Sequence, residues 1–140
     1  MCFSLMGFVN HDADFDAVRR ISLLHQQYYE KLDQFDHEPP YHFPRLEGTI
    51  GFVLHPGCDC ASAVGQGDPD QQELLDYVAW LRDLHSCPGI RFLSLAKVWD
   101  PTDAFSQQKS AWADEVDAKF LADMKEDTPY QLNFRDRSVA

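Results

Sequence analysis

The chain has 140 residues, with 23 Asp and Glu against 12 Lys and Arg, and a formal net charge of −11 at pH 7. This acidity argues against a surface for nucleic acid or an anionic membrane, because contacts to phosphate need Lys and Arg. Hydrophobic residues make up 44% of the chain and aromatic residues 13%, more than a disordered protein carries. We therefore expect one globular domain over residues 1–140, since a chain of this length can bury roughly two thirds of its unfolded surface.

The cysteine content and the hydropathy pattern indicate a compartment. There are four cysteines, too few for a disulfide scaffold, and no secretory signal precedes them. The apolar start at residues 2–9 lacks a basic segment and is too short for a signal peptide. No apolar run approaches the roughly 18 residues of a membrane span. These features predict a cytoplasmic protein without a membrane partner.

The N-terminal third predicts a strand, a long helix and a loop. The strand is Cys2–Val9, an apolar run with side chains on both faces. A helix is expected to begin at an aspartate cap and to end near Phe35, because apolar residues recur at every third or fourth position. These residues are Val18, Ile21, Leu24, Tyr28, Leu32 and Phe35. The segment Asp36–Arg45 follows as a loop, since its three prolines disfavour helix.

The middle of the chain predicts a buried strand and a second helix. Residues Gly48–Leu54 are apolar on both alternating faces, so this strand is expected inside the sheet. It ends at the Pro56-Gly57 turn, because proline cannot donate a ladder hydrogen bond. Residues Cys60–Val64 fit either a short strand paired through this turn or a loop. Asp68 and the proline after it predict the start of a helix, and Pro88-Gly89 predict its end.

Three further segments complete the predicted order. They are a strand at Ile90–Trp99, a helix from about Ser106 to Met124, and residues 125–140, which fit either an arm or a strand. The whole order is β-α-β-(β)-α-β-α.

Two folds agree with this order. If Cys60–Val64 is a strand, the chain is an α+β domain with the ferredoxin-like arrangement β-α-β-β-α-β and an added C-terminal helix. If it is a loop, the chain forms a small open α/β sheet, β-α-β-α-β-α. We prefer the first, because the Pro-Gly turn is too tight for a parallel crossover. In both folds the first and central strands run the same way, so His11 and His55 are expected at the same edge of the sheet.

Residues with metal-binding chemistry surround the Pro-Gly turn. They are His55, Cys58 and Cys60, with His11 as a further candidate ligand. Thiolate and imidazole suit zinc or another soft divalent metal, and in extended backbone the two cysteines point to the same side. The simpler interpretation is two half-buried cysteines at a turn, because the chain has no second paired-ligand motif. A redox pair is a further alternative, although no Cys-x-x-Cys motif is present.

Two enzyme classes would use the same thiols. The Met-Cys start resembles that of the N-terminal nucleophile amidotransferases, but only those two residues match, so Cys2 is more simply a strand cysteine. A hydrolase would draw its groups from one edge of the sheet: Cys58 or Cys60, His11 or His55, and Asp12 or Asp100. No nucleophile elbow, phosphate-binding loop or dinucleotide fingerprint is present, so we assign no catalytic residue.

The distribution of acidic residues favours a binding function. Asp33, Asp36 and Glu38 lie at a predicted helix C-terminus, where the helix dipole opposes negative charge. Such charge is expected to serve a basic partner, and the aromatic run Tyr41-His42-Phe43 would add contact area. The leading prediction is a cytoplasmic binding protein that neutralises or escorts a basic protein, similar in size and charge to immunity proteins. A binding protein of this kind is expected to need no cofactor.

The alternative prediction belongs to another class. It is a small metal-dependent or thiol enzyme with its site at the edge of the sheet that holds His11, His55, Cys58 and Cys60. Zinc is the metal that these ligands favour.

Overall fold

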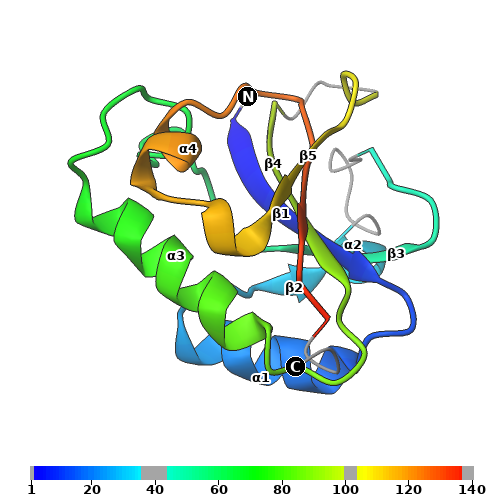
Figure 1. Ribbon diagram of the computed structural model, residues 1–140. Helices are drawn as coiled ribbons and strands as arrows, with labels where there is room; N and C mark the ends of the chain where they lie inside the picture. Colours follow the sequence, from blue (N-terminus) through cyan, green and yellow to red (C-terminus); the bar gives the residue numbers. More distant parts are fainter. Residues whose placement is uncertain (1, 36–43, 100–103, 137–140) are drawn as a thin grey trace.

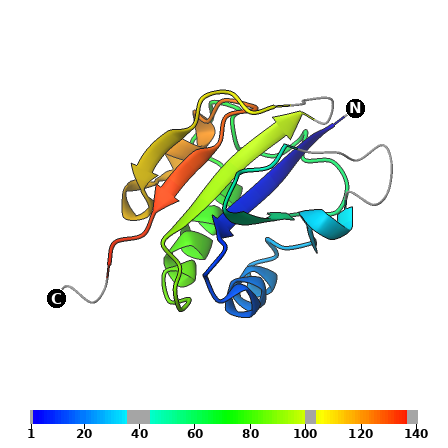
Figure 2. The same ribbon diagram turned by 90° about the vertical axis from the view of Figure 1, so that its right-hand side faces the viewer.

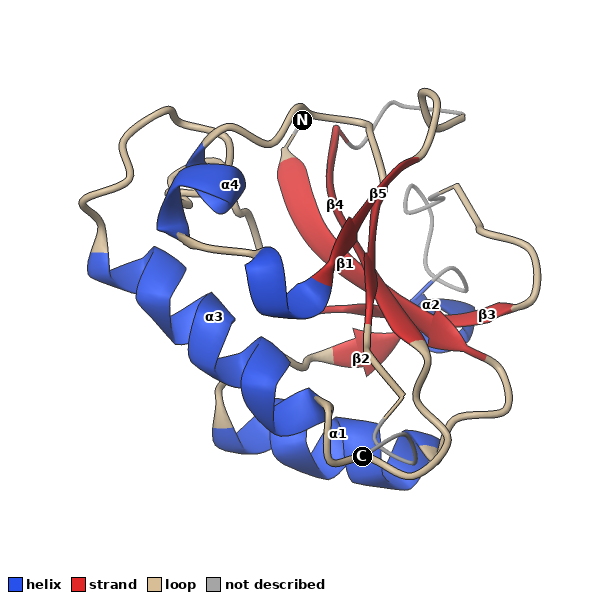
Figure 3. Cartoon of the chain, in the orientation of Figure 1, coloured by secondary structure: helices blue, strands red, loops and turns tan. Residues whose placement is uncertain are grey.

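The computed structural model describes residues 2–35, 44–99 and 104–136. Within these residues the chain forms one six-stranded sheet, with strand order β2-β3-β1-β4-β6-β5 (Figure 1). The strands are β1 (Phe3–Asn10), β2 (Glu30–Lys31), β3 (Thr49–Val53), β4 (Phe92–Trp99), β5 (Lys109–Trp112) and β6 (Tyr130–Asn133). The helices are α1 (Phe15–Leu24), α2 (Leu32–Phe35), α3 (Gln72–Leu84), the 3-10 turn η1 (Ala113–Glu115) and α4 (Ala118–Ala122) (Figure 3).

Strand β1 lies inside the sheet, where it pairs antiparallel with β3 on one side and with β4 on the other. Met6 faces Val53 of β3 and Ala96 of β4. Side chains alternate between the two faces, so Leu5 enters the main core whereas Phe8 enters a smaller apolar cluster on the opposite face. Burial on both faces explains why this strand reads as a continuous apolar run.

Helices α1 and α3 lie side by side on one face of the sheet (Figure 2). The Trp80 indole N–H donates to Ser22 Oγ at 2.9 Å, which joins the two helices inside the core. Asp14 caps α1, because its carboxylate accepts the N–H of Ala17 at 3.2 Å. Helix α3 buries one row of side chains: Leu74, Tyr77, Trp80, Leu81 and Leu84.

The first helix is shorter than the apolar spacing predicts. Helix α1 ends at Leu24, and Gln26 then adopts a φ of 60°, which turns the chain out of the helical path. Of the residues that continue the spacing, Tyr28 lies in the segment between α1 and β2, whereas Leu32 and Phe35 belong to helix α2. Strand β2 exists because it pairs with β3, a contact that helical periodicity cannot reveal.

The predicted helix from Ser106 to Met124 is wrong. This segment forms β5, η1 and α4, because the backbone is extended at Val116 and Asp117 starts a new helix. The Asp117 carboxylate accepts the Phe120 N–H at 2.8 Å. Residues 125–140, predicted as an arm or a strand, contribute β6, which pairs antiparallel with β4 and parallel with β5.

The α+β class is confirmed, but the predicted strand directions are not. Residues Cys60–Val64 are a loop, and the strand that precedes β3 and pairs with it is β2. Because β2 was hidden in the predicted helix, the direction assigned to the central strand was reversed. Strands β1 and β3 are antiparallel, so His11 and His55 lie at opposite ends of them and the predicted shared edge is wrong. The open sheet of parallel strands is excluded for the same reason.

Candidate functional site

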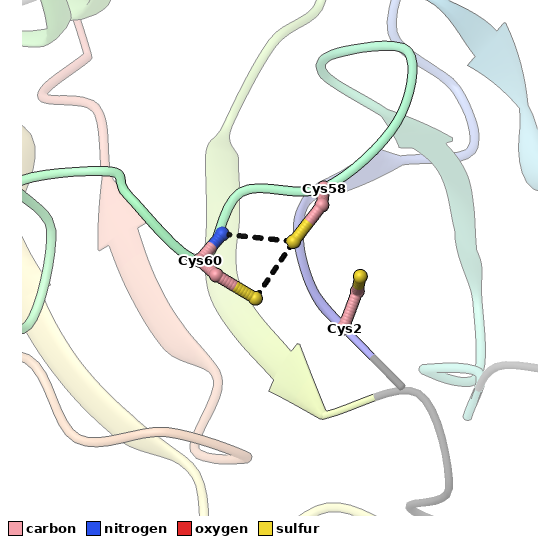
Figure 4. Close-up of side chains that lie close together, drawn as sticks. All are labelled: Cys2, Cys58 and Cys60. Carbon is pink, nitrogen blue, oxygen red and sulfur yellow. Dashed lines mark hydrogen bonds between the residues drawn. The ribbon is translucent and has the colours of Figure 1, made fainter.

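Three cysteine thiols meet where the loop after β3 passes the start of β1 (Figure 4). The sulfur atoms of Cys2, Cys58 and Cys60 all lie within 4.8 Å of one another. The Sγ atoms of Cys58 and Cys60 are 2.7 Å apart. Cys58 and Cys60 are exposed and Cys2 is half-buried, so this thiol cluster opens to solvent. In the part of the chain that the structure describes, no other group of three metal-ligating side chains is this close.

Hydrogen bonds tie the loop to the start of β1. The Asp59 N–H donates to the Phe3 carbonyl oxygen at 2.8 Å, and the Phe3 N–H donates to Cys60 Sγ at 3.3 Å. Cys2 precedes Phe3 in the chain, so these two bonds hold its thiol beside the loop. The thiol cluster is therefore a product of strand-to-loop pairing between residues far apart in sequence.

The residue between the two loop cysteines anchors the loop in the interior. Asp59 is only 7% exposed, and its Oδ2 accepts the Leu5 N–H at 2.8 Å. Its Oδ1 lies 2.6 Å from Nδ1 of His55. Asp59 is buried whereas Cys58 and Cys60 on either side of it are exposed, so both thiols lie on the outside of the loop.

Hydrogen bonds within the thiol cluster separate the pKa values of its members. The thiols of Cys2 and Cys60 and the backbone N–H of Cys60 hydrogen-bond to Cys58 Sγ, which lowers the pKa of Cys58. The hydrogen bond to Cys58, followed by burial, raises the pKa of Cys2 to about 11. Cys58 is therefore the first of the two to become a thiolate, the form that binds metals and acts as a nucleophile.

The two histidines predicted as metal ligands lie outside the thiol cluster. Both ring nitrogens of His55 are engaged, with Nε2 at 2.7 Å from Gln27 Oε1 and Nδ1 at the Asp59 carboxylate. His11 is exposed beyond the far end of β1, where its Nδ1 lies 3.2 Å from the Gly48 carbonyl oxygen. The structure thus brings the predicted cysteine pair together with Cys2 in place of either histidine.

From the sequence, Cys2 is either an N-terminal nucleophile or, more simply, a strand cysteine, and neither interpretation places it beside other thiols. Its place beside Cys58 and Cys60 follows from the loop that runs along β1, and no local pattern reports that path. The only available signal was a third cysteine at the start of a predicted strand, which does not specify a partner.

The groups predicted for a hydrolase do not assemble in the described residues. His55 and Cys58 line one cavity of about 640 Å³ between α3 and the loop, but no hydrogen bond joins them there. Asp12 is at the far end of β1, where it accepts from Asn10 and pairs with Arg91. Asp100 lies outside the described residues.

Most of the residues predicted to bind a protein partner also lie outside the described residues. These are Asp36, Glu38, Tyr41, His42 and Phe43. Asp33 is described, and its predicted place at a helix C-terminus is wrong: it lies in the first turn of α2, because α1 already ends at Leu24. It is exposed, and its carboxylate lies 3.7 Å from the Arg45 guanidinium. Part of its charge is therefore balanced within the chain.

Comparison with known proteins found no family model that matches the chain, and no curated protein or solved structure similar to it. Among the described segments, every helix is too short or too polar to span a membrane.

Proposed function

We propose that the protein binds a soft metal ion through the thiolates of Cys2, Cys58 and Cys60. The observation that carries this proposal is the convergence of three sulfur atoms within 4.8 Å, from two distant segments of the chain. Thiolate ligands select zinc and copper(I) over magnesium or calcium. Zinc is the leading candidate, because tetrahedral zinc is the commonest ion held by cysteine-rich sites in proteins.

The spacing of the sulfur atoms suits a zinc ion after one small adjustment. With a Zn–S distance of about 2.3 Å, sulfur ligands of a tetrahedral ion lie roughly 3.8 Å apart. The Cys58 and Cys60 sulfur atoms, 2.7 Å apart, would have to separate by about 1 Å. Both side chains are exposed, so rotation about their Cα–Cβ bonds supplies this movement without disturbing the core.

The surrounding backbone favours thiolate ligands. The N–H groups of Phe3 and Cys60 donate to the sulfur atoms of Cys60 and Cys58, each at 3.3 Å. Such donors stabilise the negative charge of metal-bound sulfur and fix its orientation. Binding displaces the remaining thiol protons, so metal affinity is expected to rise with pH. Three protein ligands leave one position of the ion open to solvent.

Metal analysis of the purified protein tests this proposal. The wild-type chain, purified without chelators under anaerobic conditions, is expected to retain one metal ion, measured by inductively coupled plasma mass spectrometry. Cys58→Ser should lose the ion. Cys87→Ser is the matched control, because Cys87 is buried elsewhere in the core and should not affect the metal content.

Two outcomes would contradict metal binding. One is a fully reduced chain that holds no metal and gives no sulfur-to-cobalt absorption band when Co²⁺ is added. The other is a chain two hydrogens lighter than expected, with Cys58 linked to Cys60. That result would assign the thiol cluster to thiol–disulfide exchange.

A second candidate function, neutralisation of a basic protein, is favoured by the net charge of −11. Its mechanism would be steric occlusion assisted by electrostatic steering. Native mass spectrometry of protein from its own source reports bound metal and bound protein in one spectrum. A copurified basic protein without metal would favour this candidate, and its association rate should then fall steeply with salt. A rate unchanged by salt would contradict steering.

We also propose that β1 to β4 form a ferredoxin-like core. The strand order β2-β3-β1-β4 and the antiparallel pairing of all three neighbours support this assignment. Strands β6 and β5 then extend the sheet beyond β4. An experimental structure in which β2 does not pair with β3 would contradict it.

A further inference from the structure

A buried lysine without an acidic partner lies at the wall of a cavity next to β1. Lys97 of β4 is only 5% exposed, and its ammonium donates to the Val64 carbonyl oxygen at 2.9 Å. The Lys97 Nζ lies 5.4 Å from the centroid of the Phe3 ring. Across residues 2–35, 44–99 and 104–136, no carboxylate forms an ion pair with this ammonium.

This environment is costly for a charged group. An ammonium has three N–H donors, and the described residues supply one hydrogen-bond acceptor. Burial of a charge without a counter-charge is strongly unfavourable, so buried lysines are normally paired. The neighbours of Lys97 on the same face of β4 include Leu95, and an apolar side chain would fit the core there. The Val64 carbonyl and the Phe3 ring thus leave two N–H donors of the ammonium without an acceptor among the described residues.

The cavity beside Lys97 has room for a small molecule. Its volume is about 900 Å³, and it lies between the Gly65–Gly67 loop and the chain that follows α4. The Gly65 backbone runs near the lysine stem, since a Cβ at this position would lie 3.8 Å from Lys97 Cδ. Phe3 and Met124 supply apolar wall, and the hydroxyl residues Ser106 and Thr128 supply polar wall.

The acidic residues at this cavity are not placed to neutralise Lys97. Asp123 forms an ion pair with Lys119 at 3.0 Å, and Glu126 is exposed to solvent. Both line the cavity, but neither forms a hydrogen bond or ion pair with the Lys97 ammonium. An anion that enters the cavity would therefore find an unpaired ammonium.

We propose that this cavity binds a small organic carboxylate, whose anionic group pairs with the Lys97 ammonium and whose apolar part contacts Phe3 and Met124. The carboxylate would accept the N–H donors that the described residues leave unused, in a charge-assisted hydrogen bond. The site is independent of the proposed metal site, although Phe3 adjoins both: its N–H donates to Cys60, and its ring faces Lys97.

Thermal unfolding with added carboxylate tests the proposal. Sodium butyrate is the probe, and sodium chloride at equal ionic strength is the reference. Butyrate should raise the unfolding midpoint of the wild-type chain above that reference, because a ligand that binds only the folded state stabilises it. Lys97→Met should abolish the shift. Lys109→Met, which changes an exposed lysine outside the cavity, should keep it.

A second measurement keeps the test valid if Lys97→Met does not fold. In the wild-type chain, butyrate should shift the amide NMR signals of Gly65, Gly67 and Thr128, and it should leave β2 signals unchanged. The proposal is overturned if butyrate changes the unfolding midpoint and the NMR signals of the wild-type chain no more than chloride does. It is also overturned if butyrate changes them equally in a folded Lys97→Met variant. A stronger response to inorganic phosphate than to butyrate overturns the assignment to a carboxylate.

Discussion

At the scale of single residues, the pKa order of the cysteines decides which thiol reacts first. Hydrogen bonds lower the pKa of Cys58, whereas burial raises that of Cys87 to about 11. The thiolate is the reactive form, and a lowered pKa keeps more of it at neutral pH. Iodoacetamide at pH 7, without metal, should therefore alkylate Cys58 before Cys2 or Cys87, as followed by peptide mass mapping.

The variant Cys2→Ala tests the cause of this order. It removes a hydrogen-bond donor to Cys58, so the pKa of Cys58 should rise and its alkylation at pH 7 should become slower. Cys87→Ala is the control, since Cys87 does not contact the thiol cluster. Equal rates in Cys2→Ala and wild type would show that this hydrogen bond does not control the pKa of Cys58.

Ser94 supports a second prediction about a single side chain. It is fully buried on β4, and its Oγ has no hydrogen-bond partner among the described residues. A buried polar group left unpaired costs about 1–3 kcal/mol. Ser94→Ala should raise the free energy of unfolding by about 1 kcal/mol, measured by urea denaturation. Ser110→Ala on exposed β5 should leave it unchanged, and a loss of stability in Ser94→Ala would indicate an unseen partner.

At the scale of elements, glycine allows the close packing between β3 and its neighbours. A Cβ on Gly51 would lie 2.6 Å from Leu32 Cδ1 and 2.8 Å from Phe8 Cε1. Gly51→Ala therefore crowds both side chains and should lower the free energy of unfolding by about 1–3 kcal/mol in urea denaturation. The loss should be smaller in a Leu32→Ala background, because the Cδ1 atom is absent. Equal losses in both backgrounds would rule out this steric cause.

The elements that the sequence predicts correctly are those with local signals. Strands β1, β3 and β4 and helix α3 are marked by apolar patterns, and all but β1 have Pro or Gly near their ends. The predicted start of α3 is wrong, however, because the helix begins at Gln72 with Gln71 as its N-cap, after the predicted Asp68 cap. Strands β2, β5 and β6 have two to four residues each, and they exist through pairing with distant strands. The segment before Met124 has apolar residues at helical spacing, yet Trp112 is 43% exposed and belongs to an edge strand.

The candidate site likewise has one part that the sequence predicts and one part that it does not. Cys58 and Cys60 are two residues apart, so their common direction was predictable from extended backbone. Their meeting with Cys2 depends on the hydrogen bonds between the loop and Phe3. Lys97 was hidden for a related reason, because a lysine in an apolar strand does not reveal which face it occupies or what surrounds it.

At the scale of the whole molecule, the net charge of −11 should make stability depend on ionic strength. Repulsion among like charges opposes the compact state, and salt screens it. The Debye length falls from about 30 Å at 0.01 M to about 8 Å at 0.15 M. Calorimetry should therefore show an unfolding midpoint that rises by a few degrees over this range at pH 7. Near pH 4.7, the pI, the midpoint should barely respond, and an equal rise there would contradict the charge explanation.

The interior position of β1 has a consequence for biosynthesis. This strand leaves the ribosome before its two neighbours, which end at Val53 and Trp99. At ~5–20 residues per second, β4 follows β1 by roughly 5–20 s. During that time at least one edge of this apolar strand is unpaired, a state that invites aggregation. The sheet can close around β1 only after β4 has emerged.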